Sequence, residues 1–206
     1  MNPVYKYFTG LTTEQTAQLD KLQALYTEWN ERINVISRKD MDAFYEHHVL
    51  HALSIAKFTT FESGTKIIDV GTGGGFPGIP LAILFPKVEF TLLDSIGKKI
   101  KVVSAVAEAL QLQNVKAVNT RSEQHKGQYD FIVSRAVTTL PLFVSQTRHL
   151  IALQPKNAIG NGILYLKGGD LTAEIQPFKK RVFVTHLSDY FEEAFFETKK
   201  LIHLRT

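Results

Sequence analysis

The sequence has no cysteine and no long hydrophobic run, and both absences restrict what the protein can be. Without cysteine there are no disulfides, no thiolate metal ligands and no catalysis through a covalent bond to sulfur. No apolar run approaches the about 20 residues that cross a bilayer, and the first residues lack a signal peptide's apolar segment. We therefore expect a cytoplasmic protein that does not associate with membranes.

The sequence also has little excess of positive over negative charge, because the formal net charge is only +4 over 206 residues. A small positive excess is compatible with a nucleic-acid partner but does not establish one. The seven histidines lack metal-ligand spacing with companion acids, so we expect no metal site. The chain has no internal repeat or low-complexity tract, and its length suits one main hydrophobic core.

The first 60 residues have the periodicity of helices. Thr12 and Gln15 form a capping-box pattern. An apolar stripe follows at alternating spacings of three and four residues, formed by Leu19, Leu22, Tyr26, Trp29 and Ile33. These signals predict a helix over 13–33, and a second amphipathic segment predicts another over 40–58. Residues 1–60 are thus predicted to be an N-terminal helical extension.

Residues 61–206 alternate between short apolar runs and amphipathic segments. The runs predict strands over 66–70, 89–94, 115–118, 129–134, 162–167, 181–187 and 200–205. The segments between them predict helices over 80–85, 98–110 and 140–150. This alternation predicts an α/β fold, a Rossmann-like, doubly wound and mainly parallel seven-stranded sheet.

A glycine-rich loop follows the first predicted strand. The segment from Gly73 to Gly78 satisfies the pattern G-x-G-x-x-G, and Asp94 lies about twenty residues further on, where an acid would bind ribose hydroxyls. By itself the pattern suits NAD as well as other nucleotides. The alternative is a purely structural role, in which the glycines only make a tight turn and Asp94 caps a helix. Five glycines from Gly71 to Gly78, directly after a buried strand, favour a binding site.

Asp69 indicates whether the loop binds a dinucleotide such as NAD or a ligand without phosphate. Its carboxylate lies two residues before Gly71 at the tip of the strand, where it would repel a pyrophosphate. S-adenosylmethionine has no phosphate and carries an ammonium and a sulfonium, so the acid favours this methyl donor over NAD. We therefore predict that Asp69, Gly71 and Gly73 belong to an S-adenosylmethionine site.

Further motifs extend along most of the chain. They are Trp29-Asn30 with Asn34, His48, the run from Asp69 to Pro80 with its ending Phe76-Pro77-Gly78-Ile79-Pro80, Leu93-Asp94-Ser95, Lys98-Lys99, Arg121-Ser122-Glu123, Ser134-Arg135-Ala136 and Leu166-Lys167-Gly168. With these motifs the sequence resembles the glucose-inhibited division B (RsmG) family, whose members methylate guanine N7 in 16S rRNA of the small ribosomal subunit. The specific part is the phenylalanine-proline-glycine-isoleucine-proline ending, because generic methyltransferases share only the acid and the first glycines.

The resemblance implies a class I methyltransferase domain over 61–206 and roles for single residues. Gly71 and Phe76 would contact the donor, Asp94 would hold its ribose, and Ser122 and Glu123 would border the adenine. Arg135 would line the same pocket near the methyl group and act in positioning.

The family's second helix usually has histidine, two residues, aspartate and serine, whereas here His48 is followed by His51 and Ala52. This departure puts the role of the aspartate position in doubt.

The chemistry is consistent with this family. Guanine N7 carries a lone pair and no proton, so its methylation needs alignment and no general base. Enzymes that methylate exocyclic amines typically have an Asp/Asn-Pro-Pro-aromatic motif after the fourth strand, and here that position reads Ser134 to Val137. Arg135 is better suited to a carboxylate or a phosphate than to N7.

Lysines at strand ends and helix starts are the candidate RNA contacts. Lys167 ends a predicted strand beside two glycines, and Lys98 and Lys99 open a predicted helix after Asp94. These three could bind phosphate, or the helix pair could be an ordinary solvated face. Two alternatives to an rRNA methyltransferase remain: a methyltransferase for a small molecule or a protein, and a catalytically inactive nucleotide-binding assembly protein.

Overall fold

A computed structural model of the chain describes residues 2–205, apart from the side chains of residues 38 and 39. The helices are α1 (Val4–Tyr7), α2 (Thr13–Arg32), α3 (Arg38–Asp42), the π-helical turn η1 (Tyr45–Leu50), α4 (His51–Phe58), α5 (Gly78–Leu84), α6 (Gly97–Ala109), α7 (Leu140–Thr147) and α8 (Thr172–Ile175). Short 3₁₀ turns include η2 (Ser122–Gln124) and η6 (Ala194–Thr198).

Seven strands form one sheet in the order β3-β2-β1-β4-β5-β7-β6. They are β1 (Lys66–Val70), β2 (Glu89–Asp94), β3 (Val115–Asn119), β4 (Phe131–Arg135), β5 (Gly162–Gly168), β6 (Val182–His186) and β7 (Lys199–Arg205). The first five are parallel, and β7 runs antiparallel to both β5 and β6. The predicted Rossmann-like, mainly parallel seven-stranded sheet is therefore confirmed.

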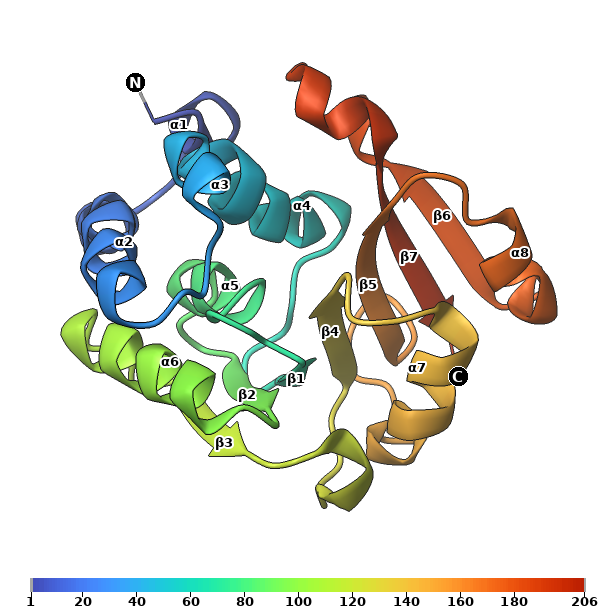
Figure 1. The fold of residues 1–206 in the computed structure, drawn as a ribbon. Helices are drawn as coiled ribbons and strands as arrows, with labels where there is room; N and C mark the ends of the chain where they lie inside the picture. Colours follow the sequence, from blue (N-terminus) through green and yellow to red (C-terminus); the bar gives the residue numbers. More distant parts are fainter. Residues whose placement is uncertain (1, 206) are drawn as a thin grey trace.

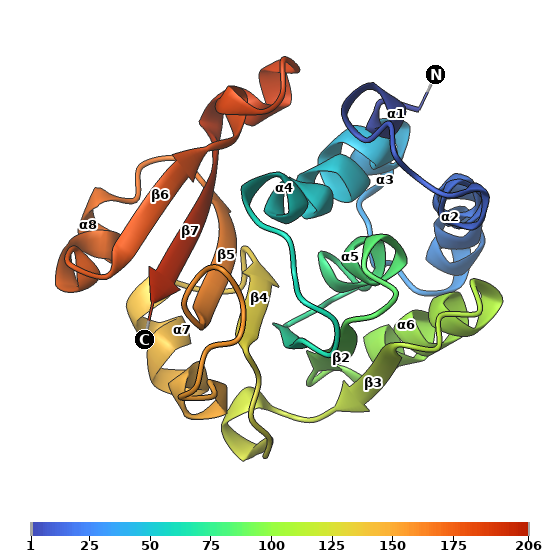
Figure 2. The ribbon, with the colours of Figure 1, turned by 180° about the vertical axis from the view of Figure 1, so that it is seen from behind.

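Helices cover both faces of the sheet, as Figures 1 and 2 show. On one face α4, α5 and α6 lie against the strands, and α1, α2 and α3 lie outside them; α7 and α8 cover the other face. Alternate strand residues supply the two cores: Ile67 belongs to the first cluster and Ile68 to the second. This is the period-2 alternation expected of a strand buried on both sides.

The N-terminal helices share a core with the sheet. Leu22 and Tyr26 of α2 and Phe44 belong to the same buried cluster as Ile67 and Leu92 of the strands. The capping box at Thr12 is present, since its side chain and that of Gln15 exchange backbone hydrogen bonds. The division into a helical extension of residues 1–60 and a separate methyltransferase domain stays a prediction.

The second predicted segment, over 40–58, is helical but is not one regular α-helix. The chain instead forms α3, the π-helical turn η1 and α4. A π-helical turn has more residues than an α-helical turn, so the faces beyond it are rotated. The packing of Phe44 against the rings of Tyr26 and Phe76, at centroid distances of 5.5 and 5.9 Å, joins this segment to the glycine loop. Such tertiary contacts override a regular helical period.

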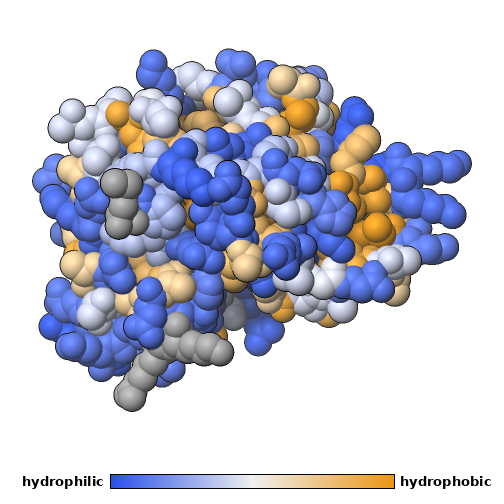
Figure 3. Space-filling view, turned by 90° about the horizontal axis from the view of Figure 1, so that it is seen from above, coloured by the Kyte–Doolittle hydropathy of each residue, from blue (hydrophilic) through white to orange (hydrophobic). Residues whose placement is uncertain are grey.

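The face of the molecule seen from above is mainly hydrophilic. Seen from above, Figure 3 shows charged and polar residues over most of the face, with an apolar area toward the β6 end of the molecule. Within residues 2–205, no helix is long and apolar enough to cross a bilayer.

Candidate functional site

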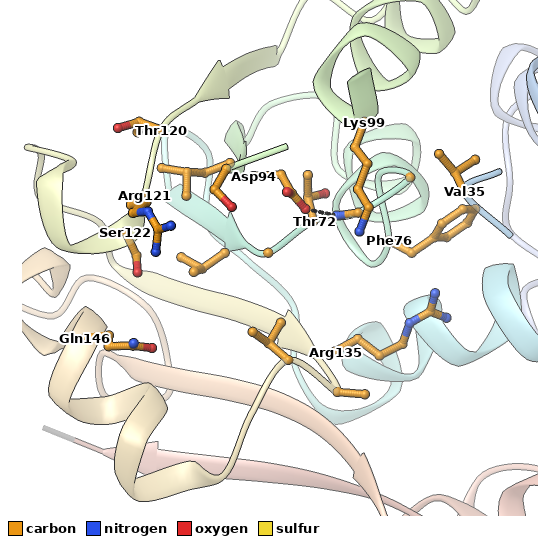
Figure 4. Close-up of a pocket in the computed structure, with 18 of the residues that line it drawn as sticks. Val35, Thr72, Phe76, Asp94, Lys99, Thr120, Arg121, Ser122, Arg135 and Gln146 are labelled. Atoms are coloured by element: carbon orange, nitrogen blue, oxygen red, sulfur yellow. Dashed lines mark hydrogen bonds between the residues drawn. The ribbon is translucent and has the colours of Figure 1, made fainter. Parts of the chain in front are cut away.

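A cavity of about 530 Å³ opens where the carboxyl ends of β1, β2 and β4 meet. Between β1 and β4 the strand order changes direction, which is where open α/β sheets bind ligands. Figure 4 shows side chains from the glycine loop, β2, η2, β4 and α7 around this space. The lining includes Val35, Gly71, Thr72, Gly73, Gly74, Phe76, Asp94, Ser95, Lys99, Arg121, Ser122, Glu123, Arg135, Val137 and Gln146.

Three glycines of the loop have left-handed backbone, and two of them, Gly71 and Gly73, differ in what surrounds them. Gly71 has φ of 69°, and a Cβ there would lie 2.6 Å from Cγ2 of Val137. Gly73 has φ of 59°, and a Cβ there would meet no atom within 4 Å. Gly71 therefore permits close packing inside the protein, whereas Gly73 exposes its backbone to the open cavity, where a ligand can approach it.

Asp69 lies beneath the loop and is fully buried. Its Oδ2 accepts hydrogen bonds from the Thr72 hydroxyl at 2.7 Å and from the Gly78 backbone N–H at 2.8 Å. Burial raises the pKa of this carboxyl to about 7, against the opposing effect of the two hydrogen bonds. Asp69 is not among the residues that line the cavity. The geometry shows that Asp69 supports the loop, and its contact with the ligand stays a prediction.

Asp94 ends β2 and faces the cavity (Figure 4). Its Oδ2 accepts from the Gly73 N–H at 3.0 Å, and its Oδ1 accepts from the Ile96 N–H at 2.9 Å. Each carboxylate oxygen can accept more than one hydrogen bond. Asp94 can therefore receive ligand hydroxyls while it fixes the loop.

The cavity has two chemically different ends, and η2 forms one of them. Ser122 donates to Oε2 of Glu123 at 3.0 Å. Hydrogen bonds from the backbone of Glu123 and from Ser122 lower the pKa of the Glu123 carboxyl, so it is charged at neutral pH. Arg121 and Gln146 line this same end, Gln146 from helix α7 (Figure 4). This end is rich in hydrogen-bonding groups.

Arg135 lies at the other end, at the last position of β4. Its guanidinium lies over the Phe76 ring, 5.3 Å from the centroid, and points away from Ser122 (Figure 4). It donates to the His47 carbonyl at 3.1 Å and bonds Nδ1 of His48 at 2.9 Å. Burial lowers the pKa of Arg135 to about 10, so the group remains a cation at neutral pH.

The three candidate RNA-binding lysines differ in position. Lys99 lines the cavity and Lys98 is exposed beside it on α6. Lys167 is not in the lining: its ammonium pairs with Glu174 and donates to the Thr138 carbonyl at 2.9 Å, and its side chain is 11% exposed. The structure thus gives Lys167 an internal partner that the sequence did not indicate, and its role in RNA binding stays a prediction.

Comparison with known proteins bears on what binds here. A family model described as "rRNA small subunit methyltransferase G" matches residues 15–202. The chain belongs to this family. It is 58% identical over 204 residues to the "Ribosomal RNA small subunit methyltransferase G" of Flavobacterium psychrophilum, covering 99% of this chain and 97% of the relative. The protein of the same name from Bacteroides thetaiotaomicron is 52% identical over 203 residues, covering 98% of each chain.

Solved structures support the fold. A protein described as a "SAM dependent methyltransferase from Aquifex aeolicus" superposes with a TM-score of 0.57 at 14% identity, covering 83% of this chain and all of that one. At this identity the likeness concerns the architecture alone. The resemblance to the RsmG family and the class I fold, both expected from the sequence, are thus confirmed.

Within this family member, the cavity brings together most of the predicted site residues. Seven of the eight predicted cofactor-binding residues line it, together with the predicted RNA contact Lys99; the seven are Gly71, Gly73, Phe76, Asp94, Ser122, Glu123 and Arg135. No role at the site was predicted from the sequence for Arg121, Val137, Val35 or Gln146. Arg121 belongs to a quoted motif and Val137 adjoins one, so their place in the sequence could have suggested them. Val35 and Gln146 come from elements far away in the sequence and carry no local signal.

Tyr26 is a further residue whose role the sequence did not show. It was predicted to be helix core, and it is fully buried. Its hydroxyl also donates to the Gly74 carbonyl at 2.5 Å, so α2 supports the glycine loop directly. No group of three or more potential metal ligands occurs in the part of the chain that the structure describes.

Proposed function

We propose that this chain transfers a methyl group from S-adenosylmethionine to N7 of a guanine in 16S rRNA, acting in the cytoplasm on the RNA or on the small ribosomal subunit. The observation that carries the proposal is the cavity in which the Gly71–Gly78 loop and the Asp94 carboxylate meet, in a chain of the rRNA small subunit methyltransferase G family.

The cavity fits the donor in size and chemistry. A volume of about 530 Å³ is within the usual range for a drug-sized ligand. Asp94 would hold the ribose hydroxyls, Ser122 and Glu123 would border the adenine, and the backbone at Gly73 would lie against the ligand. Asp69 and Gly71 would shape the loop from beneath, and Phe76 and Arg135 would lie at the end that receives the methionine part.

The bound donor supplies an electrophilic methyl group on a sulfonium. The task of the chain is then to align the guanine lone pair with that group, because N7 has no proton to remove. The acids in the lining suit this task, since Asp94 is engaged by two backbone N–H groups and Glu123 by Ser122. Binding and orientation, without a general base, are sufficient for the reaction.

The rRNA must approach the open side of the cavity. Lys99 at the lining and exposed Lys98 would contact phosphates there, and Lys167 is the third candidate. Neutralising a phosphate-binding lysine should reduce the slope of RNA affinity against salt by about one unit. From the geometry we expect this for Lys99→Ala more than for Lys167→Ala, because Lys167 is paired with Glu174.

The decisive experiment maps N7-methylguanine in 16S rRNA from cells with the wild-type chain, with no chain and with Gly73→Val. We expect the modification only with the wild type, because valine would strain the left-handed backbone and fill the open cavity. Donor binding by calorimetry accompanies the mapping. Donor binding with no rRNA methylation would favour a small-molecule or protein substrate or an inactive assembly protein, and NAD binding in place of the donor would refute the cofactor.

A further inference from the structure

The Arg135 guanidinium is held only by neutral groups. Its two hydrogen bonds go to the His47 carbonyl and to Nδ1 of His48, and its flat face lies over the Phe76 ring. Within residues 2–205, no carboxylate lies within ion-pair distance of it among the described side chains. A guanidinium has five N–H donors, so these contacts fix its position and leave both donors and charge for a ligand.

His48 is built to accept a hydrogen bond. Its ring stacks on Phe44 at 6.0 Å and packs against Phe76 at 5.3 Å, and its Nε2 is buried without a partner. Burial and the nearby Arg135 charge lower the pKa of His48 to about 3, so the ring is neutral. Since Nδ1 faces a donor-only guanidinium, the ring proton must lie on Nε2.

This arrangement has a cost that packing alone does not explain. An unpaired N–H at the buried Nε2 destabilises the folded protein, and an apolar side chain of similar size would avoid it. The next helical turn adds no acid near the guanidinium, because it places the buried His51 there. Burial and the charges of Arg135 and Lys199 keep the pKa of His51 well below its usual value, so this ring is also neutral. The guanidinium is therefore oriented without a salt bridge, and the carboxyls of Asp69 and Asp40 act on it only from beyond ion-pair distance.

We infer that His48 is a positioning residue, whose neutral imidazole fixes the Arg135 guanidinium at the end of the cavity so that Arg135 receives a carboxylate or a phosphate of the ligand. The inference rests on the proposed function, because the anion would be the carboxylate of S-adenosylmethionine or a phosphate of the RNA. Bidentate recognition of either group is what an arginine held in one plane does well.

A double-mutant cycle tests this coupling. Affinities for S-adenosylmethionine, for its decarboxylated analogue and for 16S rRNA are measured with wild type, Arg135→Gln, His48→Leu and the combined variant. Arg135→Gln should weaken binding of the anionic ligand about tenfold to a hundredfold. His48→Leu should weaken the same binding about tenfold, and the combined variant should lose no more than Arg135→Gln alone.

Conservative variants separate the acceptor from the bulk of the ring. Asparagine can place an oxygen where Nδ1 lies, whereas the longer glutamine places its amide near Nε2, so His48→Asn should restore most of the affinity and His48→Gln should not. His203→Leu is the matched control, because that imidazole is also buried and bonds the Gly160 carbonyl on a different part of the sheet. It should lower thermal stability and leave all three affinities unchanged.

The three affinities show which anion Arg135 binds. A loss for S-adenosylmethionine but not for its decarboxylated analogue assigns the carboxylate, and a loss confined to RNA assigns a phosphate. Additive losses in the cycle, or His48→Asn behaving like His48→Gln, would overturn the inference. A wild type that binds the donor but methylates no rRNA would refute the proposed function alone, since the cycle measures binding and not methylation.

Discussion

Tyr26→Phe removes one oxygen and thereby tests whether α2 controls the donor site. The hydroxyl donates to the Gly74 carbonyl at 2.5 Å, and both residues are buried. Phenylalanine keeps the ring contacts with Phe44 and Phe76. The change therefore affects mainly the hydrogen bond to the loop, and the packing of the core stays close to that of the wild type.

The magnitude follows from the burial of the carbonyl. An acceptor left unsatisfied in the interior costs about 1–3 kcal/mol of unfolding free energy. For a chain of 206 residues, this corresponds to a fall in Tm of roughly 2–12 °C. Because Gly74 lies in the cavity lining, we also expect weaker donor binding, by about threefold to tenfold, as the loop loses its support.

Thermal unfolding and calorimetric titration with S-adenosylmethionine measure the two effects. Tyr45→Phe is the matched control, because that hydroxyl bonds the carbonyls of Leu19 and Asp20 on α2 and does not touch the loop. It should lower stability without changing donor affinity. Unchanged donor affinity in Tyr26→Phe, or an equal loss in Tyr45→Phe, would refute the argument that α2 supports the loop.

Two further predictions concern the acids of the site. Burial raises the pKa of Asp69 from 3.8 to about 7, so between these values the folded state keeps a proton that the unfolded state has lost. The stability from Asp69 therefore falls as pH rises from 3.8 to about 7 and is constant above that. In urea unfolding, the stability of Asp69→Asn relative to the wild type should therefore rise between pH 5 and pH 8, by on the order of 3 kcal/mol at most. A difference that stays constant with pH would contradict the assignment. Asp94→Asn has only one oxygen for the N–H groups of Gly73 and Ile96, and it should weaken donor binding by about 1–3 kcal/mol in calorimetry with unchanged RNA affinity; the opposite pattern would exclude the ribose-binding role.

Local patterns in the sequence predicted the elements of the sheet closely. The strands over 66–70 and 89–94 have the predicted bounds, and the helix over 98–110 lies within a residue of its observed limits. Such signals are local, since hydrophobic periodicity and glycine content depend on neighbouring residues only. The cavity residues at strand ends could also be predicted. Gly71, Asp94 and Arg135 each follow or end a predicted parallel strand, and the carboxyl ends of such strands meet at one edge of the sheet.

The sequence did not predict where the side chains at that edge point or which groups they contact. The sequence predicted a ligand contact for Asp69, which stays a prediction, but not that its carboxylate lies under the loop, where Thr72 and Gly78 donate to it. Lys167 was expected at the RNA surface, but α8 brings Glu174 to its ammonium. These partners lie 3, 9 and 7 residues further along the chain, and the fold of the intervening loop or turn brings them into contact.

The sequence by itself therefore determined the order of elements, the glycine loop, the acid of β2 and the family. Only the tertiary structure decided that Tyr26 supports the loop and that Arg135 is held by His47 and His48. The physical reason is that the π-helical turn and the packing of α2 against α5 depend on contacts between segments far apart in the chain. No local period or motif encodes which carbonyl a buried hydroxyl meets or which imidazole faces a guanidinium.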